Sequence, residues 1–210
     1  MTSREMLTAM DANMLAAAFP VEHAPAVLSA AQETARLLSP RQWTGRFAVQ
    51  VASDEVLIPT RLHFASTRLA LLESDKAWPF ARALQTRSND GFERQRAARD
   101  LLRNTEAWGA PFIVGLIGEY IVEILQDVDD ALTPELEQVL GAFIVDNAAF
   151  WATTKRRVAS YWNAYYRSNW VSDLRKAYRR HEYVGFDLIY RLDAAASRVV
   201  AQRTGAVIAI

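Results

Sequence analysis

Two glutamates within the most apolar stretch of the sequence are the residues best placed to do chemistry. Glu119 and Glu123 are four residues apart in the stretch 108–128, which we expect to form one helix. At that spacing, two helical side chains project from the same face. Carboxylates held together inside an apolar bundle can keep a proton or hold a metal ion. The pair allows a helical-bundle enzyme or a ligand binder centred on Glu119 and Glu123.

Other features of the sequence argue against a metal at this pair. Bundle proteins that hold metal ions usually add a Glu-x-x-His step on neighbouring helices, and the chain contains none. Its three histidines, His23, His63 and His181, are not spaced as paired ligands. We therefore expect no metal and no cofactor.

A structural role explains the same glutamates. An unpaired carboxylate is costly to bury, so a buried glutamate is expected to pair with an arginine from an adjacent helix. Arg94 and Arg96 lie in the preceding helical segment and are candidates for that pairing. The predicted buried polar residues are Glu119, Glu123, Arg94 and Arg96. The other structural alternative is that both glutamates face solvent along a narrow stripe.

Charged residues are segregated along the sequence, although the chain as a whole is neutral. It has 24 Lys plus Arg and 24 Asp plus Glu, so no bulk charge draws a partner to it. The segment 104–154 has no basic residue and carries the acidic residues Glu106, Glu119, Glu123, Asp127, Asp129, Asp130, Glu135, Glu137 and Asp146. In the segment 151–191 basic residues outnumber acidic ones. We expect one acidic part of the surface and one basic part.

The basic segment also carries tryptophans and tyrosines. This mixture is typical of surfaces that bind nucleic acid, because aromatic rings stack on bases while arginines hold phosphates. Helical spacing weakens that interpretation. It places Trp151 and Tyr165 in one sector of the helix and Arg156 and Arg167 in the opposite one. The aromatic rings are thus predicted to lie in the core, with only Tyr166 near the basic side.

Two basic groups close together in the sequence can still form one binding face. The candidates for binding a polyanion or a partner are Lys155, Arg156, Arg167, Arg175, Lys176, Arg179 and Arg180. Each phosphate that they neutralised would add a salt-sensitive contribution to binding. The competing interpretation is a positive patch that docks against an acidic partner, such as the acidic face of another copy of the chain.

Common catalytic and nucleotide-binding motifs are missing. The sequence lacks a Gly-x-Ser-x-Gly motif, a His-Glu-x-x-His motif and a dinucleotide-binding glycine fingerprint. It has no cysteine to serve as a nucleophile or a ligand. The stretch 86–91 precedes a helix start, but Asp90 would compete with an anion for the backbone amides. This stretch predicts a capped turn, not a phosphate site.

The elements that position these residues are predicted to be mainly helical. Apolar spacing indicates an N-terminal helical hairpin over 1–38 and a helical body over 66–203. Alternation on both sides of a polar tetrapeptide predicts a small β-hairpin within 46–64, with a helix as the alternative. Pro59 places its second strand at an edge or a bulge. We expect a single mainly α domain, 1–210, built as a helical bundle or as helical hairpins similar in arrangement to HEAT repeats, without a residue-level repeat.

These observations together favour a non-enzymatic protein–protein interaction or scaffold module of a larger assembly. Aromatic residues of the kind found here anchor many interfaces, so we expect a protein partner or a homo-oligomer. Nucleic-acid binding through the basic helix faces at 155–180 is the alternative. No apolar run approaches the ~20 residues that cross a bilayer, which predicts a cytoplasmic protein without a transmembrane segment. The apolar residues 205–210 are expected to dock on the body or on a partner.

Overall fold

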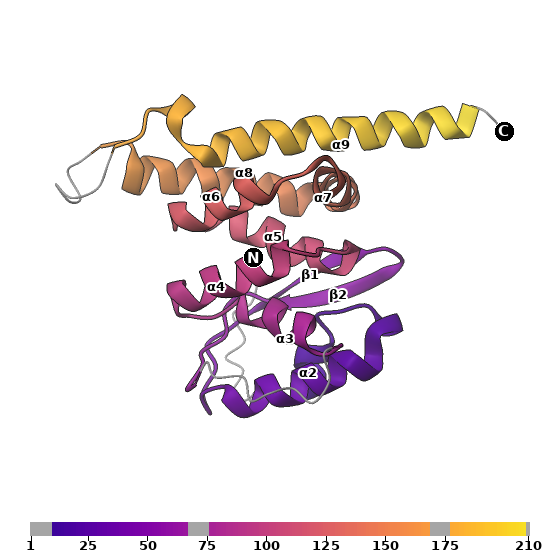
Figure 1. The fold of residues 1–210 in the computed structure, drawn as a ribbon, viewed down its shortest axis with the longest axis vertical. Coiled ribbons are helices and arrows are strands. Elements are labelled where there is room, and N and C mark those ends of the chain that lie inside the picture. The colour runs from indigo at the N-terminus through magenta and orange to yellow at the C-terminus, as the bar shows by residue number, and fades with distance from the viewer. Residues whose placement is uncertain (1–9, 67–75, 169–176, 209–210) are drawn as a thin grey trace. The chain divides into compact units, whose positions relative to one another are not determined.

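Helices form most of the chain in the computed structural model, and the sheet found among the described residues has two antiparallel strands (Figure 1). The structure describes residues 10–66, 76–168 and 177–208, with side chains up to residue 205. The predicted fold class, mainly α with a small β-hairpin, is confirmed. Close contacts divide the chain into two compact units, Met1–Phe112 and Ile113–Ile210, which we call unit 1 and unit 2. The single domain over 1–210 stays a prediction.

Unit 1 begins with two helices that pack against each other. α1 spans Ala12–Ala16 and starts after Asp11, whose carboxylate accepts a hydrogen bond at 2.8 Å from an amide of the first turn. α2 spans Ala24–Leu37 and follows a short 3₁₀ turn. The two helices occupy the place of the predicted hairpin over 1–38, of which residues 1–9 lie outside the described part.

The predicted β-hairpin is confirmed, with a shorter turn than expected. β1 spans Arg46–Val51 and β2 spans Asp54–Pro59, in antiparallel register. Only Ala52 and Ser53 form the turn, and Ala52 has a φ of 53°, in the left-handed region that glycine and asparagine adopt more readily. The strands bury the alternating residues Val49, Val51, Val56 and Ile58. Pro59 ends β2, in keeping with its missing N–H.

Two further helices complete unit 1, and the first of them carries one ring of an aromatic core. α3 spans Trp78–Gln85 and α4 spans Gly91–Leu102. Asp90 caps α4 as predicted, because its carboxylate accepts hydrogen bonds from the amides of Phe92 at 2.8 Å and Glu93 at 3.2 Å. The core rings are those of Phe19, Phe80, Trp108 and Phe112, with neighbouring centroids 4.4 to 5.9 Å apart.

A buried ion-pair network joins α3 to α4. The Arg82 guanidinium lies 3.0 Å from the Glu93 carboxylate and 2.7 Å from the Asp100 carboxylate. It also lies over the Trp78 ring, 5.6 Å from the centroid. Glu93 is buried, and its second oxygen is 2.5 Å from the exposed Arg96 side chain. Two arginines therefore share one buried carboxylate, one from the interior and one from solvent.

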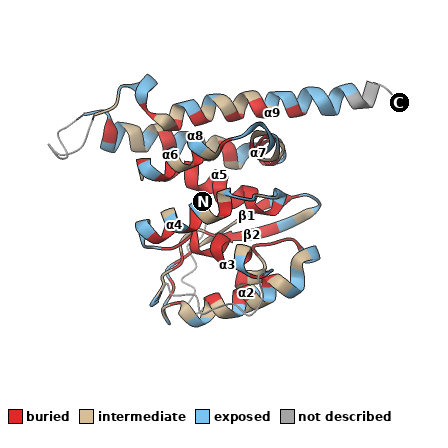
Figure 2. Cartoon of the chain, viewed as in Figure 1, coloured by how far each residue is buried: buried red, intermediate tan, exposed pale blue. Residues whose placement is uncertain are grey.

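Unit 2 is built mainly from four helices. α5 (Ala110–Ile117) contains the boundary between the units. After it come α6 (Val122–Ala131), α7 (Pro134–Asp146), α8 (Ala148–Tyr161) and α9 (Val184–Ile208). α9 contacts α7 and α6, and buried, intermediate and exposed residues alternate along it up to Val199, whereas residues 200–205 are all exposed (Figure 2). Within the described ranges, every helix is too short or too polar to cross a membrane.

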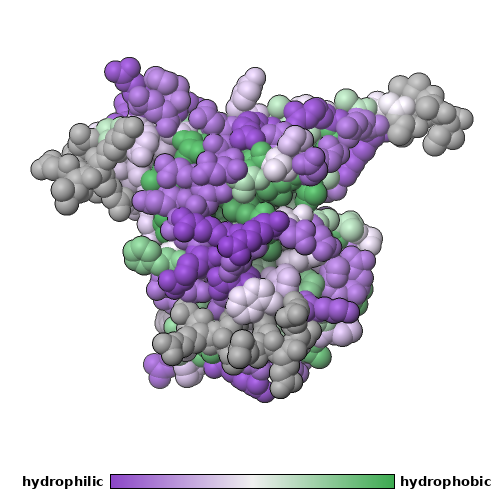
Figure 3. All heavy atoms as spheres, in the orientation of Figure 1, coloured by the Kyte–Doolittle hydropathy of each residue, from purple (hydrophilic) through white to green (hydrophobic). Residues whose placement is uncertain are grey.

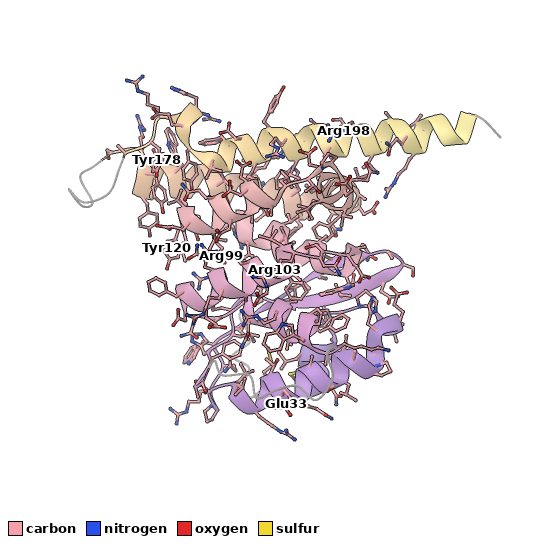
Figure 4. All side chains as sticks on the ribbon, viewed as in Figure 1. Glu33, Arg99, Arg103, Tyr120, Tyr178 and Arg198 are labelled. Carbon is pink, nitrogen blue, oxygen red and sulfur yellow. The ribbon has the colours of Figure 1, made fainter. Side chains whose placement is uncertain are left out.

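Acidic residues of α6 and α7 pair with basic residues of α9. One guanidinium nitrogen of Arg191 lies 2.8 Å from the Asp129 carboxylate and another lies 3.1 Å from the Glu137 carboxylate. α9 adds two further ion pairs at 2.6 Å, Arg198 with Glu137 and Arg203 with Asp146 (Arg198 is labelled in Figure 4). Arg191 of the predicted basic segment is therefore paired with Asp129 and Glu137 of the predicted acidic segment, so these three residues do not lie on separate acidic and basic surfaces.

α7 and α9 approach closely at Gly141. A Cβ added to this glycine would lie 2.9 Å from the Ala195 carbonyl carbon and 3.1 Å from the Ala195 Cβ. Contacts that short force atoms apart in a packed interior. The absence of a side chain at Gly141 therefore sets the distance between the two helices.

The network around Glu93 predicts unequal effects for its two arginines. Arg82→Met leaves the buried carboxylate without its inner partner, which is expected to cost about 3–5 kcal/mol of unfolding free energy. Arg96→Met is the matched control, because it removes only the solvent-exposed arginine and leaves Glu93 its buried partner Arg82, and ion pairs made by an exposed side chain contribute at most about 1 kcal/mol. Urea unfolding of the two variants measures the difference. Equal losses would contradict burial as its cause.

The close approach of α7 and α9 predicts that Gly141→Ala destabilises unit 2. Overpacking costs about 1–3 kcal/mol, which outweighs the gain of about 1 kcal/mol from replacing glycine in a helix. Gly205→Ala on α9 is the control, because a Cβ added there meets nothing within 4 Å, and we expect it to be neutral or stabilising. Thermal unfolding followed by circular dichroism compares them. A Tm for Gly141→Ala at or above the wild-type value would rule out the tight contact.

Candidate interaction surface

The central segment 108–128 is two helices, so the prediction of one unbroken helix is wrong. α5 ends at Ile117 and α6 begins at Val122. Between them, Ile121 has a φ of −93° and a ψ of 106°. This extended conformation interrupts the ladder of helical hydrogen bonds and leaves helix-end groups that need other partners. The helix break over 118–121 is the first feature of the candidate site.

A tyrosine from elsewhere in unit 2 bonds to the backbone at this break. The Tyr166 hydroxyl donates to the Tyr120 carbonyl at 2.5 Å and accepts a hydrogen bond from the Val122 amide at 3.3 Å. Val122 is buried, so its amide would otherwise lack a partner. Tyr166 is itself buried. A single hydroxyl therefore takes the place of helical hydrogen bonds at the junction of α5 and α6.

Tyr166 reaches the break because α8 is followed by a π-helical turn over Trp162–Tyr166. In this turn the Arg167 amide donates to the Trp162 carbonyl at 2.8 Å, which spans five residues instead of the usual four. The extra residue rotates the side chains that follow. Uniform α-helical spacing predicts Tyr165 in the core and Tyr166 on the basic side. That prediction is wrong, since Tyr166 is buried and Tyr165 is exposed.

Three tyrosines gather at the surface beside the break. The ring centroids of Tyr120, Tyr161 and Tyr165 lie 5.9 to 6.1 Å from one another, within the range of aromatic pairs. Tyr120 is 41% exposed and Tyr165 is 38% exposed, while Tyr161 is half-buried. Figure 4 labels Tyr120 at the edge of unit 2. We call Tyr120, Tyr161 and Tyr165 the tyrosine patch.

Arg157 adds a positive charge one helical turn before Tyr161. Its side chain packs on the break, since a Cβ added to Gly118 would lie 3.3 Å from the Arg157 Cδ. Arg157 is exposed, and no acidic side chain in the described part of the chain pairs with it. The candidates drawn from the sequence omit Arg157 and Tyr120. The four-residue spacing of Arg157, Tyr161 and Tyr165 does indicate a shared face, but nothing local in the sequence places Tyr120 beside it.

A second buried tyrosine supports Tyr166. The ring of Tyr183 stacks on that of Tyr166 with centroids 5.2 Å apart, and Tyr183 is fully buried. Its hydroxyl has no hydrogen-bond partner among the described residues. Burial raises the pKa of Tyr183 well above its usual range, with contributions from Tyr166 and Tyr178, so the hydroxyl stays protonated. One stacked tyrosine therefore bonds to two backbone groups while the other contributes packing.

No protein-family model matches this chain. Neither the curated proteins nor the solved structures give a significant match to it. Its function has to be inferred from its own residues.

The predicted buried polar residues divide into two that are buried and two that are exposed. Glu119 and Arg94 are buried. Glu123 and Arg96 are exposed, so their predicted burial is wrong. The reason for Glu123 is the helix break, which starts a new helix and ends the face shared with Glu119, whereas Arg96 reaches Glu93 from the solvent side of α4.

Arg94 and Glu119 lie in different units of the chain. Arg94 donates to the Ser88 carbonyl at 2.7 Å within unit 1. Glu119 belongs to unit 2, and its pairing with Arg94 stays a prediction. Within the described ranges, no group of three or more histidine, aspartate or glutamate side chains is placed to hold a metal ion.

The basic candidates on α8 and its π-helical turn differ in their surroundings. Lys155 is half-buried, and its amine lies 3.1 Å from the Asp193 carboxylate. Arg156 and Arg167 are exposed, and they donate to neutral oxygens of nearby side chains at 2.8 and 3.1 Å. One of the three is therefore neutralised, and two remain open to a partner.

The second basic group is only partly described. Arg179 and Arg180 are exposed, and the Arg180 guanidinium lies over the Phe186 ring, 4.3 Å from its centroid. Arg175 and Lys176 lie outside the described residues. The union of both basic groups in one face stays a prediction.

The two stacked tyrosines give a matched pair of substitutions that each remove one oxygen. Tyr166→Phe strips the Tyr120 carbonyl and the Val122 amide of their shared partner, which is expected to lower the unfolding free energy by about 1–3 kcal/mol. Tyr183→Phe removes a hydroxyl that is buried without a bond, so stability should stay the same or rise. Urea unfolding followed by circular dichroism measures both. Greater damage from Tyr183→Phe would refute the assignment of the break to Tyr166.

Proposed function

We propose that this protein is a non-enzymatic protein–protein interaction module of a larger assembly, and that the tyrosine patch of unit 2 binds its partner. The observation that carries the proposal is the patch itself, in which two of three adjoining rings are more than one third exposed. Tyrosine is enriched among the residues that dominate binding energy at interfaces. Its ring buries a large area while its hydroxyl keeps a hydrogen-bonding group.

The patch is held in place before a partner arrives. The backbone of Tyr120 is bonded to Tyr166, and Tyr161 and Tyr165 lie on successive turns of one helical segment. A surface fixed in advance loses less conformational entropy on binding. Arg157 at its edge can form a bidentate bond with a carboxylate. The chemistry therefore suits a partner that offers apolar or aromatic side chains next to an acidic residue.

A nucleic acid is the alternative occupant, since bases stack on rings of this kind. The nearby charges favour a protein. Lys155 is paired with Asp193, and Arg191 is paired with two acidic residues, so both offer less charge to a phosphate. Glu123 is exposed three residues after Tyr120 and would repel a phosphate backbone.

An enzyme built on a carboxylate pair has less support. Glu119 is buried just before the start of α6, while Glu123 is exposed in its first turn. The two side chains do not share one helix face across the break. Proton or metal chemistry that needs adjacent carboxylates would have to draw its second group from elsewhere.

Affinity purification with quantitative mass spectrometry tests the interaction module. Tyr120→Ala/Tyr165→Ala removes two rings of the patch but keeps the Tyr120 carbonyl to which Tyr166 donates. Tyr190→Ala is the matched control, because Tyr190 is 78% exposed on α9 and lies outside the patch. We expect the wild type to capture a partner protein and the Tyr190→Ala control to capture the same amount of it. Its affinity for the double variant should fall at least about thirtyfold, because loss of a hot-spot residue costs about 2 kcal/mol or more.

Two outcomes would replace this proposal. A partner that binds the double variant as tightly as the wild type would move the binding surface away from the patch. Binding of a fluorescent single-stranded oligonucleotide that weakens steeply with salt and is lost in the double variant would assign the patch to nucleic acid. Circular dichroism of each variant verifies that its fold is intact.

A further inference from the structure

The side chain of Arg157 lies against the backbone of Gly118 at the helix break. A Cβ added to Gly118 would lie 3.3 Å from the Arg157 Cδ and 3.6 Å from the Arg157 Cβ. Gly118 is buried, whereas Arg157 is exposed. The aliphatic part of Arg157 therefore covers the break while its guanidinium reaches solvent, as is usual for long basic side chains.

The missing side chain at Gly118 allows this contact. Thr154, three residues before Arg157 on α8, packs at the same place, with its Cγ2 3.5 Å from the added Cβ. Alanine at 118 would have to push the Arg157 stem outward, because the packed backbone leaves no room for another carbon. A stem that lies on the protein has fewer conformations than one in open solvent, which lowers the entropy cost of a bond to its guanidinium.

The positive charge of Arg157 is not neutralised by an acidic side chain among the described residues. Other basic residues of unit 2 differ in this respect. Lys155 pairs with Asp193 at 3.1 Å, and Arg191 lies 2.8 Å from the Asp129 carboxylate. Arg157 is therefore a cation that is held in place and left open to a partner.

Arg157 lies at one end of a row that continues into the tyrosine patch. Arg157, Tyr161 and Tyr165 follow one another at intervals of four residues, so helical spacing places the arginine about one turn from the first ring. The Tyr161 ring lies 6.1 Å from that of Tyr165 and 6.0 Å from that of Tyr120. The surface thus offers adjoining rings with one charge beside them.

A surface with this arrangement requires polar groups of its partner as well as rings. Hydrophilic residues predominate on the face of unit 2 seen in Figure 3, and Figure 4 labels Tyr120 at the edge of that face. A partner that covers the patch displaces water from the Arg157 guanidinium, and this is costly unless the partner supplies an acceptor.

The charge at the edge decides which partner groups fit. Three tyrosine rings alone could hold a lysine or arginine of a partner, but Arg157 would repel a second cation. A carboxylate instead gains two parallel hydrogen bonds from a guanidinium. Glu123, which is exposed three residues after Tyr120, disfavours a long run of negative charges. A single carboxylate next to aromatic or apolar groups is the best complement.

We propose that Arg157, positioned by Gly118, makes the tyrosine patch selective for a partner segment in which an aspartate or glutamate lies at one end of a short run of aromatic residues. The inference rests on the proposed function and adds the residue that selects the partner. Arg157 binds the carboxylate, while the rings of the segment pack on the patch. Gly118 acts only through Arg157, as a positioning residue.

Fluorescence polarisation of labelled peptides tests this selectivity. Three short probes share one run of tryptophan and leucine and carry glutamate, glutamine or lysine at one end. The wild type is expected to bind the glutamate probe at least about tenfold more tightly than the glutamine probe, because its bonds to Arg157 are charge-assisted. The lysine probe should bind most weakly.

Three variants assign the preference to its residues. Arg157→Gln should let the glutamate and glutamine probes bind alike. Arg156→Gln is the matched control, because Arg156 is exposed on the same helix but points about 100° away from Arg157, and it should keep the preference. Gly118→Ala should give an intermediate ratio of the two dissociation constants, because it displaces the Arg157 stem but keeps the charge. Damage to the fold would weaken both probes together and leave that ratio unchanged.

Several results would overturn the inference. Equal binding of the glutamate and glutamine probes by the wild type, with both lost in Tyr120→Ala/Tyr165→Ala, would remove the selectivity but keep the patch as the binding surface. Binding of no probe would also count against it. A single-stranded oligonucleotide that binds more tightly than the glutamate probe, and that Arg157→Gln releases, would assign Arg157 to phosphate. The proposed function fails separately, if the partner captured by the wild type ignores the double variant.

Discussion

The hydroxyl of Tyr166 meets two backbone groups at the point where α5 gives way to α6. The Tyr166 side chain reaches this position because the π-helical turn over Trp162–Tyr166 rotates it toward the interior. The same turn leaves Tyr165 outside, and the break that the hydroxyl stabilises presents Tyr120 beside it. The π-helical turn and the break between α5 and α6 therefore account for both the buried bond of Tyr166 and the exposed tyrosine patch. Irregular turns of this kind occur frequently at functional sites.

Electrostatics in unit 2 depends on contacts between distant segments. Arg191 draws together Asp129 and Glu137, and α9 continues the pattern along α7. Several of these pairs are partly exposed, where each contributes about 1 kcal/mol or less. Their larger effect is on the surface potential, because they cancel charges that the sequence keeps apart. Arg156 and Arg157 are the basic residues of α8 that are exposed and have no acidic partner among the described residues.

Local signals predict much of the fold. Alternating residues indicate the β-hairpin, and Asp90 and Thr133 mark helix starts through their own side chains. The candidate site is different, because its decisive bonds join residues 44 and 46 positions apart. Helical spacing assumes a uniform 100° per residue, so it fails for Tyr165 and Tyr166 as soon as one turn widens. It also treats Glu119 and Glu123 as neighbours on a helix face that the fold interrupts.

The bent junction of α5 and α6 also constrains how the chain acquires its structure. Before the turn that carries Tyr166 docks, the backbone at 118–121 cannot bond to the Tyr166 hydroxyl. A continuous helix would then supply hydrogen-bond partners to the amides of this stretch. Bending it therefore waits for closure of a long loop, which costs chain entropy before it yields a contact. Contacts of such high sequence separation slow folding. The bend between α5 and α6 therefore depends on a bond to Tyr166 that becomes available only after the segment following α8 has docked.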